Sequence, residues 1–395
     1  MLTQKQGALR NWFLSFRCAV SQGCWLLILY FSAWVAVAAP VPAPPQLSAD
    51  SYLLIDFTSG KVLAEKDADK RIEPASLTKI MTSYIVAREL QRGSISHDEP
   101  VIVSEYAQSM PGSRMFAEAG TIITVKDLLR GLIIQSGNDS SVALAEHIAG
   151  TEDAFAAMMN RVANEKGMQN TNYVNASGLP ATDHYTTAND LAIITRATIQ
   201  EFPEHYKMYS EREFTFNGIR QKNRNKLLWR DESVDGMKTG HTEAAGYCLV
   251  STAVRNGDMR LISIVLGTSS DKARIAESQR LLNYGFRFFR THRVYEAGEI
   301  VSEARIWMGD SESIPLGVAE DLWVTLPRDA FDNLQSQIEV SEYIRAPANI
   351  GEEFGRSLIK LENQTIEEVP LLALQKVDQA GLMRRMKHSI IRYFH

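Results

Sequence analysis

The segment "EPASLTKIMT", residues 73–82, places Ser76 three residues before Lys79 at the predicted start of a helix. Side chains three positions apart lie on the same face of a helix, so the amine could reach the hydroxyl. The same Ser-x-x-Lys spacing recurs at residues 269–272 and 357–360, and any copy could equally be a helix end with a solvated lysine. The spacing alone therefore does not identify a nucleophile.

Two further short motifs occur once each and distinguish between the three copies. Ser136-Gly137-Asn138 lies in a break between two predicted helices, and Lys238-Thr239-Gly240 lies on a predicted strand. Only the copy at Ser76 precedes both motifs. The order Ser-x-x-Lys, Ser-x-Asn, Lys-Thr-Gly is complete only from this residue, which makes Ser76 the candidate nucleophile.

Ser76 needs a base, because a serine hydroxyl is a weak nucleophile near neutral pH. Lys79 can serve only if its amine is neutral part of the time. Burial and a neighbouring cation such as Lys238 would both lower its pKa in this direction. The helix start also supplies unpaired backbone N–H groups beside Ser76, and these suit a developing oxyanion.

Ser136 and Asn138 require a loop if both are to point into one site, since residues two apart on a helix point in different directions. Ser, Gly, Asn and Asp also favour helix caps and turns, so a capping role is the alternative.

Lys238 would supply positive potential for a substrate carboxylate, and Thr239 would donate a hydrogen bond to it. Gly240 removes side-chain bulk, which would let a peptide approach as an added strand. The alternative is an exposed strand end without a ligand.

Apolar periodicity predicts an α+β domain over residues 46–290. A hairpin at residues 51–67 is followed by mostly helical segments up to about residue 200. Strands return at residues 234–268, and a helix follows at 271–290. Strands at both ends with helices between them predict one antiparallel sheet covered by helices.

The rest of the chain predicts a smaller all-β domain, residues 293–378, and an amphipathic helix, residues 380–395. On a helical wheel, one side of this helix is apolar and the other is basic: Leu382, Met383, Met386, Ile390, Tyr393 and Phe394 against Arg384, Arg385, His388 and Arg392. Such a pattern is typical of a helix that lies on a membrane surface. Docking on the protein's own surface is the alternative.

The first 38 residues predict a signal peptide that is cleaved after Ala38. Three basic residues precede an apolar run that ends in small residues. An uncleaved membrane anchor is the alternative. Cleavage would remove Cys18 and Cys24, so the remaining Cys248 could form no intramolecular disulfide, and core packing is its expected role.

The charge balance argues against nucleic-acid binding. Loss of the three leader cations from the 42 basic residues leaves 39 against 47 acidic ones, a net charge of −8. An acidic exported protein lacks the basic surface that nucleic acids require. The sequence contains no motif for a metal or a nucleotide, so we expect no cofactor.

"SLTK", "SGN" and "KTG", in this order, resemble the three motifs of the penicillin-binding proteins and serine β-lactamases. "GSRMF", "FTFNGIRQKNRN" and "VDGMKTGHT", together with the β domain and the tail, more closely resemble the periplasmic D-alanyl-D-alanine carboxypeptidases of low molecular weight. The resemblance runs from about residue 46 to the C-terminus. It implies a penicillin-binding/β-lactamase-like fold for the first domain.

The resemblance also implies roles for single residues. Ser136 would relay a proton to the leaving group, and Asn138 would bind a substrate amide. The backbone N–H groups of Ser76 and His241 would form the oxyanion hole, with the His241 side chain shaping the pocket. Arg224 would lie near the carboxylate-binding end.

The expected function is therefore that of a serine-type D-Ala-D-Ala carboxypeptidase. It would remove the terminal D-alanine from peptidoglycan stem pentapeptides through an acyl-enzyme on Ser76, and β-lactams would acylate the same residue. The expected location is the periplasm, on the outer face of the inner membrane.

Three alternative functions are compatible with parts of this pattern. A β-lactamase shares the motifs, but no Glu-x-x-Leu-Asn segment lies between the second and third. A DD-endopeptidase uses the same chemistry, although relatives of that kind usually lack the second domain. An idle scaffold would hold stem peptides at the membrane without cleaving them.

Overall fold

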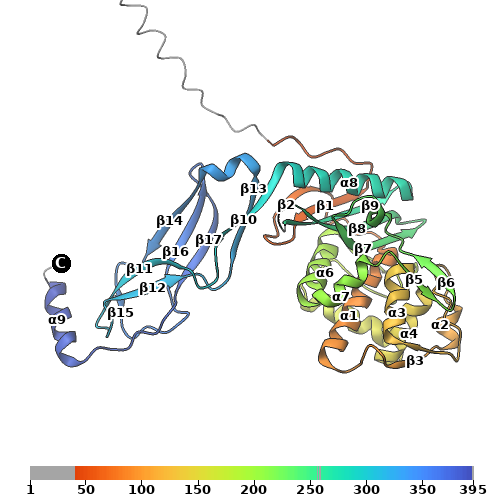
Figure 1. The fold of residues 1–395 in the computed structure, drawn as a ribbon, viewed down its shortest axis with the longest axis horizontal. Coiled ribbons are helices and arrows are strands. Elements are labelled where there is room, and N and C mark those ends of the chain that lie inside the picture. The colour runs from red at the N-terminus through yellow and green to blue at the C-terminus, as the bar shows by residue number, and fades with distance from the viewer. Residues whose placement is uncertain (1–40, 256, 258, 394–395) are drawn as a thin grey trace, which may run out of the picture. The chain divides into compact units, whose positions relative to one another are not determined.

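The computed structural model describes residues 41–255, 257 and 259–393. The first domain is built on a five-stranded antiparallel sheet in the order β2-β1-β9-β8-β7 (Figure 1). Its strands are β1 (Ser51–Asp56), β2 (Val62–Lys66), β7 (Val234–Thr242), β8 (Gly246–Arg255) and β9 (Met259–Thr268). The prediction of one antiparallel sheet built from both ends of the domain is confirmed. The predicted leader lies outside the described residues.

Helices cover both faces of this sheet, and the alternation of side chains along β1 shows why. Leu53 and Ile55 enter a core that also contains residues of α1 (Lys79–Arg92) and α6 (Ala188–Glu201). Leu54, between them, enters the opposite core beneath α8 (Asp271–Phe288). Figure 1 shows α8 on one side of the sheet and the other helices on the opposite side.

The remaining elements of this domain surround α1. The helices and turns are η1 (Ala75–Thr78), α2 (Glu105–Ser109), α3 (Val125–Arg130), η2 (Gly131–Gln135), α4 (Asn138–Ala149), α5 (Glu152–Glu165), α7 (Pro203–Tyr206), η3 (Lys207–Ser210) and η4 (Lys226–Trp229). Two small hairpins pair β3 (Pro100–Ile102) with β4 (Ile122–Thr124), and β5 (Glu213–Phe216) with β6 (Ile219–Lys222). The helix predicted from Ser76 begins as the short 3₁₀ turn η1, and regular α-helix starts at Lys79.

The second domain is all-β, as predicted. Its main sheet has the order β14-β16-β17-β12-β11-β15, and β10 pairs separately with β13. The strands are β10 (Phe289–Tyr295), β11 (Ile300–Trp307), β12 (Ser313–Gly317), β13 (Leu322–Pro327), β14 (Leu334–Val340), β15 (Ile344–Arg345), β16 (Glu353–Leu361) and β17 (Gln364–Ala373), with the turn η5 (Arg328–Asn333). Buried residues such as Ile306, Ile314 and Leu371 form its core.

The chain ends in the helix α9 (Leu382–Tyr393), which confirms a short C-terminal helix. Leu382, Met383 and Met386 are 71%, 83% and 53% exposed, so the apolar side chains described there lie open to solvent. Across the described ranges, no helix has the length and apolar character needed to cross a membrane.

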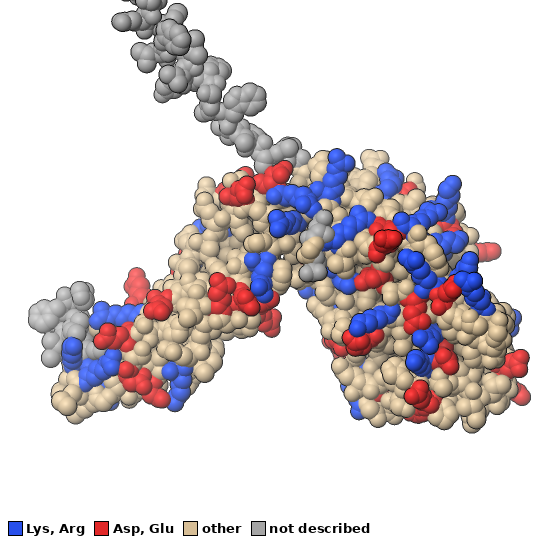
Figure 2. All heavy atoms as spheres, viewed as in Figure 1, with Lys and Arg blue, Asp and Glu red and all other residues tan. Residues whose placement is uncertain are grey.

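Two smaller predictions concern Cys248 and surface charge. Cys248 is fully buried on β8, which confirms core packing, and burial raises the pKa of its thiol to about 11. Figure 2 shows acidic and basic side chains interspersed on the face in view, rather than gathered by sign.

Candidate active site

A cleft of about 450 Å³ lies between η1, the start of α4 and strand β7. Seven of the nine predicted site residues are among those that line it: Ser76, Ser136, Asn138, Arg224, Thr239, Gly240 and His241. The other two, Lys79 and Lys238, are buried beside it. The structure therefore brings all nine together, from segments far apart in the chain, while their chemical roles stay predictions.

Lys79 makes three hydrogen bonds at the base of the cleft. Its amine lies 3.1 Å from the Ser76 hydroxyl and donates to Asn138 Oδ1 at 2.6 Å. It also donates to the backbone carbonyl of Ser177 at 2.5 Å. The turn formed by η1 and the first residue of α1 brings Ser76 and Lys79 together, as their three-residue spacing predicts.

Burial lowers the pKa of Lys79 to about 7, although Asp139 and Glu152 act in the opposite direction. The positive charge of Arg224 adds to the lowering. Burial was predicted as a cause, whereas the contribution of Arg224 was not expected. The repulsion between Lys79 and the expected cation, Lys238, lowers the pKa of Lys238. An amine with this pKa is neutral about half of the time at pH 7, as a general base must be.

The second motif contacts the third directly. Lys238 donates to the Ser136 hydroxyl at 2.7 Å and to the Thr239 carbonyl at 3.2 Å. Ser136 has a φ of 65°, in the left-handed region between η2 and α4, and this turn points its side chain toward β7. Burial, together with the charges of Lys79, Arg224 and Arg274, holds the pKa of Lys238 well below its usual range.

Asn138 opens α4 instead of lying in a free loop. Its Nδ2 donates to the Pro111 carbonyl at 2.6 Å, which fixes the amide so that Oδ1 faces Lys79. The next residue, Asp139, was expected only to favour a cap or a turn. Its buried carboxylate accepts hydrogen bonds from four backbone N–H groups, those of Met115, Phe116, Ala117 and Ser140.

Asp139 thus attaches the segment before Ala117 to the start of α4. Gly112 and Ser113, in that segment, line the cleft. The position of Asp139 directly after Ser-Gly-Asn was the only signal in the sequence that could have drawn attention to it.

Gly240 has a packing role that was not predicted, while its role toward a peptide substrate stays a prediction. A Cβ at this position would lie 3.1 Å from the Pro74 carbonyl and from Leu77 Cγ, and 3.3 Å from Ala75 Cβ. The missing side chain therefore lets β7 pack directly against η1, the turn that carries Ser76. His241 follows on the same strand, is exposed, and lies against the Tyr247 ring with 3.9 Å between ring centroids.

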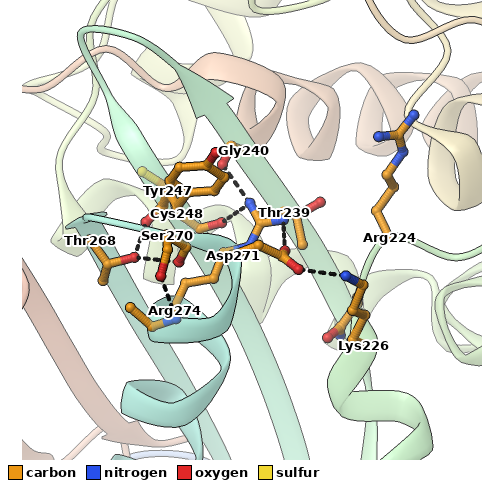
Figure 3. Close-up of polar contacts among 12 residues, drawn as sticks. Arg224, Lys226, Thr239, Gly240, Tyr247, Cys248, Thr268, Ser270, Asp271 and Arg274 are labelled. Atoms are coloured by element: carbon orange, nitrogen blue, oxygen red, sulfur yellow. Dashed lines mark hydrogen bonds and ion pairs between the residues drawn. The ribbon is translucent and has the colours of Figure 1, made fainter.

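A second arginine, Arg274 on α8, joins Arg224 at the cleft and was not predicted. Figure 3 shows its guanidinium directed at β7 and β8, where it donates to the carbonyls of Gly240 at 2.8 Å and Cys248 at 3.3 Å. Asp271 pairs with Arg274 at 2.5 Å and with Lys226 at 2.6 Å. Arg224 bonds through Nε to the Gln135 carbonyl at 3.3 Å, so this end of the cleft is cationic.

This cleft can perform acyl transfer. It places a serine hydroxyl beside a buried amine whose pKa suits a base, a second hydroxyl–amine pair nearby, and cations for an anionic substrate group. Over the ranges that the structure describes, no cluster of three or more His, Cys, Asp or Glu side chains is arranged to hold a metal ion. Fold and site together define a serine enzyme of the penicillin-binding type.

Comparison with known proteins gives the family. Residues 38–270 match the model of the D-alanyl-D-alanine carboxypeptidase family, and residues 289–379 match the C-terminal domain of penicillin-binding protein 5. The chain belongs to the D-alanyl-D-alanine carboxypeptidase family, which confirms the predicted family and enzyme class.

Individual relatives agree over most of their length. The D-alanyl-D-alanine carboxypeptidase DacA of Escherichia coli strain K12 is 42% identical over 363 residues, 90% of each chain. Penicillin-binding protein 5 from Haemophilus influenzae superposes with a TM-score of 0.82 at 41% identity, covering 86% of this chain and all of that one. Penicillin-binding protein D2 from Listeria monocytogenes, solved with ampicillin bound, is 30% identical with a TM-score of 0.57, covering 61% of this chain and all of that one.

Proposed function

We propose that this protein removes the terminal D-alanine from peptidoglycan stem pentapeptides through an acyl-enzyme on Ser76. The observation that carries the proposal is the contact between the Ser76 hydroxyl and the buried amine of Lys79, 3.1 Å apart. Family membership supplies the bond that is cleaved, the one between the last two D-alanines.

In the first half of the reaction, Ser76 Oγ attacks the carbonyl carbon of the penultimate D-alanine and gives its proton to Lys79. The negative oxygen that forms would be held by the backbone N–H groups of Ser76 and His241. The C–N bond then breaks. The departing amine takes a proton from the Ser136 hydroxyl, and Lys238 replaces that proton through the hydrogen bond it already makes.

In the second half, water adds to the ester on Ser76 and the shortened peptide leaves. Before this step Lys79 would lose the proton it took from Ser76, and Lys238 would regain one from solvent. The neutral Lys79 would then take a proton from the attacking water and pass it to Ser76 Oγ as the ester C–O bond breaks. Arg224, Arg274 and Thr239 lie where the free carboxylate of the terminal D-alanine would bind, and Asn138 would accept from a substrate amide.

The same chemistry accounts for binding of β-lactams, whose strained amide would acylate Ser76 in place of the peptide. Support comes from the Listeria relative solved with ampicillin.

The three alternative functions, a β-lactamase, an endopeptidase and an idle scaffold, differ from a carboxypeptidase in the product that they release. A scaffold releases nothing, and an endopeptidase cuts between linked peptides.

The product of a synthetic pentapeptide ending in D-Ala-D-Ala tests the proposal. We expect free D-alanine and a tetrapeptide lighter by one alanine residue, measured by mass spectrometry. An unchanged peptide would contradict carboxypeptidase activity. Rapid turnover of penicillin without peptide cleavage would establish a β-lactamase instead, and cleavage confined to cross-linked dimers would establish an endopeptidase.

We further propose residues 46–290 as the catalytic domain, 293–378 as the β domain and 380–395 as a membrane-surface anchor. Enzymes of this family act on the cell wall, outside the cytoplasm. The exposed Leu382, Met383 and Met386 on α9, with cations on the same helix, support attachment to an anionic membrane. Arg384 donates to the Asp310 carbonyl at 2.7 Å, a contact that the alternative of docking on the protein itself would use.

Deletion of residues 381–395 tests the anchor. We expect the truncated protein to lose binding to vesicles of anionic lipid while it cleaves a soluble pentapeptide at the full rate. Vesicle binding that survives the deletion would contradict the proposal for α9. The replacement Arg384→Lys in the full-length protein is the control, because it removes the guanidinium that donates to the Asp310 carbonyl and keeps both the positive charge and the apolar side chains.

A further inference from the structure

The loop of residues 175–179, here called the Ser177 loop, lies behind the catalytic amine. Its Ser177 carbonyl accepts from Lys79 Nζ at 2.5 Å, a contact through the backbone alone. Ser177, Gly178 and Leu179 also line the cleft. The course of this loop therefore determines where one of the three partners of Lys79 lies.

The side chain of Asn175 holds the loop in its turn. Its Oδ1 accepts from the backbone N–H of Gly178 at 2.7 Å and of Ser177 at 3.2 Å. Its Nδ2 donates to the Leu179 carbonyl at 2.9 Å. The side-chain amide of Asn175 thus bonds to backbone groups that lie before and after the Ser177 carbonyl, as in an Asx turn.

The rest of the structure fixes the ends of the loop. The Ala176 N–H donates to Glu152 Oε1 at 2.9 Å, and its carbonyl accepts from Thr82 Oγ1 on α1 at 2.7 Å. Gly178 has a φ of +83°, and a Cβ there would lie 1.7 Å from the Ala75 carbonyl oxygen. The loop is therefore tied to the two elements that carry Ser76 and Lys79.

The three partners of Lys79 differ in what they can do. A neutral amine has two N–H bonds and one lone pair. Asn138 Oδ1 and the Ser177 carbonyl can only accept, because the Asn138 amide is fixed by its bond to Pro111. When both N–H bonds point to these acceptors, the lone pair is left for the Ser76 hydroxyl.

We propose that Asn175 is a positioning residue for the reaction: by holding the Ser177 carbonyl on Lys79, it directs the lone pair of the amine at Ser76. This inference rests on the proposed function of Ser76 and Lys79. Asn175 itself is not among the residues that line the cleft, so it acts through the amine rather than on the substrate.

The experiment separates binding from acylation with a chromogenic penicillin in stopped flow, on the full chain. In Asn175→Ala we expect the acylation rate at saturating penicillin to fall about tenfold, the effect of one lost hydrogen bond in the transition state. The dissociation constant of the complex before acylation should stay within about twofold. Asn175→Asp, which keeps the acceptor for both N–H groups, should restore most of the rate.

Asn172→Ala is the matched control. Asn172 lies on the same segment and also bonds to a backbone carbonyl, that of Asp183 at 2.7 Å, without touching the Ser177 loop. Its rate should equal that of the wild type. If Asn175→Ala does not fold, Asn175→Ser, which keeps a weaker acceptor, should give a rate between those of the wild type and a tenfold loss.

Several results would overturn the inference. They are an unchanged rate in Asn175→Ala, an equal loss in Asn172→Ala, a loss confined to the dissociation constant, or no recovery in Asn175→Asp. If the wild-type protein formed no acyl-enzyme at all, the proposed function would fail as well, and this outcome is distinct from the other four.

Discussion

The amine of Lys238 and the hydroxyl of Ser136 lie 2.7 Å apart, although 102 positions separate them in the sequence. Lys238 is 1% exposed, so it meets this hydroxyl with little water nearby. Ser136 lines the same cleft as Ser76, and we propose that the pair is a second route for a proton. In that case Ser136 and Lys238 would deliver a proton to the leaving group, while Lys79 removes the proton of Ser76.

The two members of this pair should act as one unit. In Ser136→Ala and in Lys238→Met we expect acylation by penicillin to slow about 100-fold, the usual contribution of a positioned proton donor. The double variant should be little slower than either single one, because the second change removes a group that has already lost its partner. Losses that multiply to about 10,000-fold would show independent roles.

The rate of acylation should follow the protonation of Lys79. Since burial lowers the pKa of Lys79 to about 7, the neutral base becomes scarce below pH 7. We expect the rate to fall about tenfold per pH unit there and to level off above about pH 8. A rate that is flat between pH 5 and 8 would contradict Lys79 as the base.

Two variants should shift the pH at which the acylation rate begins to fall, here called the pH limb, in opposite directions. Arg224 lowers the pKa of Lys79, so Arg224→Gln should shift the limb to higher pH. Asp139 raises that pKa, so Asp139→Asn should shift the limb to lower pH. Exposed Asp153→Asn serves as the charge control, with no shift expected. Shifts of the same sign in both variants would contradict the electrostatic explanation.

Asp139→Asn should also destabilise the fold. Its carboxylate accepts four backbone N–H bonds, and an amide in its place would turn a donor toward some of them. We expect a loss of about 2 kcal/mol in the free energy of unfolding, measured by denaturant titration. Stability equal to that of the wild type would mean that the segment from Met115 to Ala117 is held by other contacts.

Gly240→Ala should separate β7 from the turn that carries Ser76. The added Cβ would meet Pro74, Leu77 and Ala75 at 3.1–3.3 Å, closer than ordinary contact. We expect a destabilisation of about 1–3 kcal/mol, from thermal unfolding, with slower acylation. Gly381→Ala is the control because a Cβ there has no neighbour within 4 Å. Full activity and stability in Gly240→Ala would refute the packing argument.

Much of the site could be predicted because its side chains belong to short motifs whose order is visible in the sequence. Ser76, Ser136 and Lys238 were placed in one cleft in this way. The central sheet followed from apolar runs at both ends of its domain. By contrast, β12 contains Pro315 and spans only residues 313–317, so its sequence gives little sign of a strand.

The rest of the site depends on tertiary packing. Arg274 reaches the Gly240 carbonyl only because α8 packs on the sheet, and an arginine in an amphipathic helix gives no sign of this. The Ser177 carbonyl is a backbone group, so no residue type reveals it. Which cations act on Lys79 depends on distances in the folded chain, which explains why Arg224 was not expected.

Ser76 is the residue on which the proposed acyl group is carried. The most direct test of this role is the intact mass of the wild-type protein and of Ser76→Ala after incubation with benzylpenicillin, with D-alanine release from a pentapeptide measured on the same samples. We predict one penicilloyl adduct and D-alanine release for the wild type, and neither for Ser76→Ala. An adduct or released D-alanine in the folded Ser76→Ala protein would show that another residue is acylated.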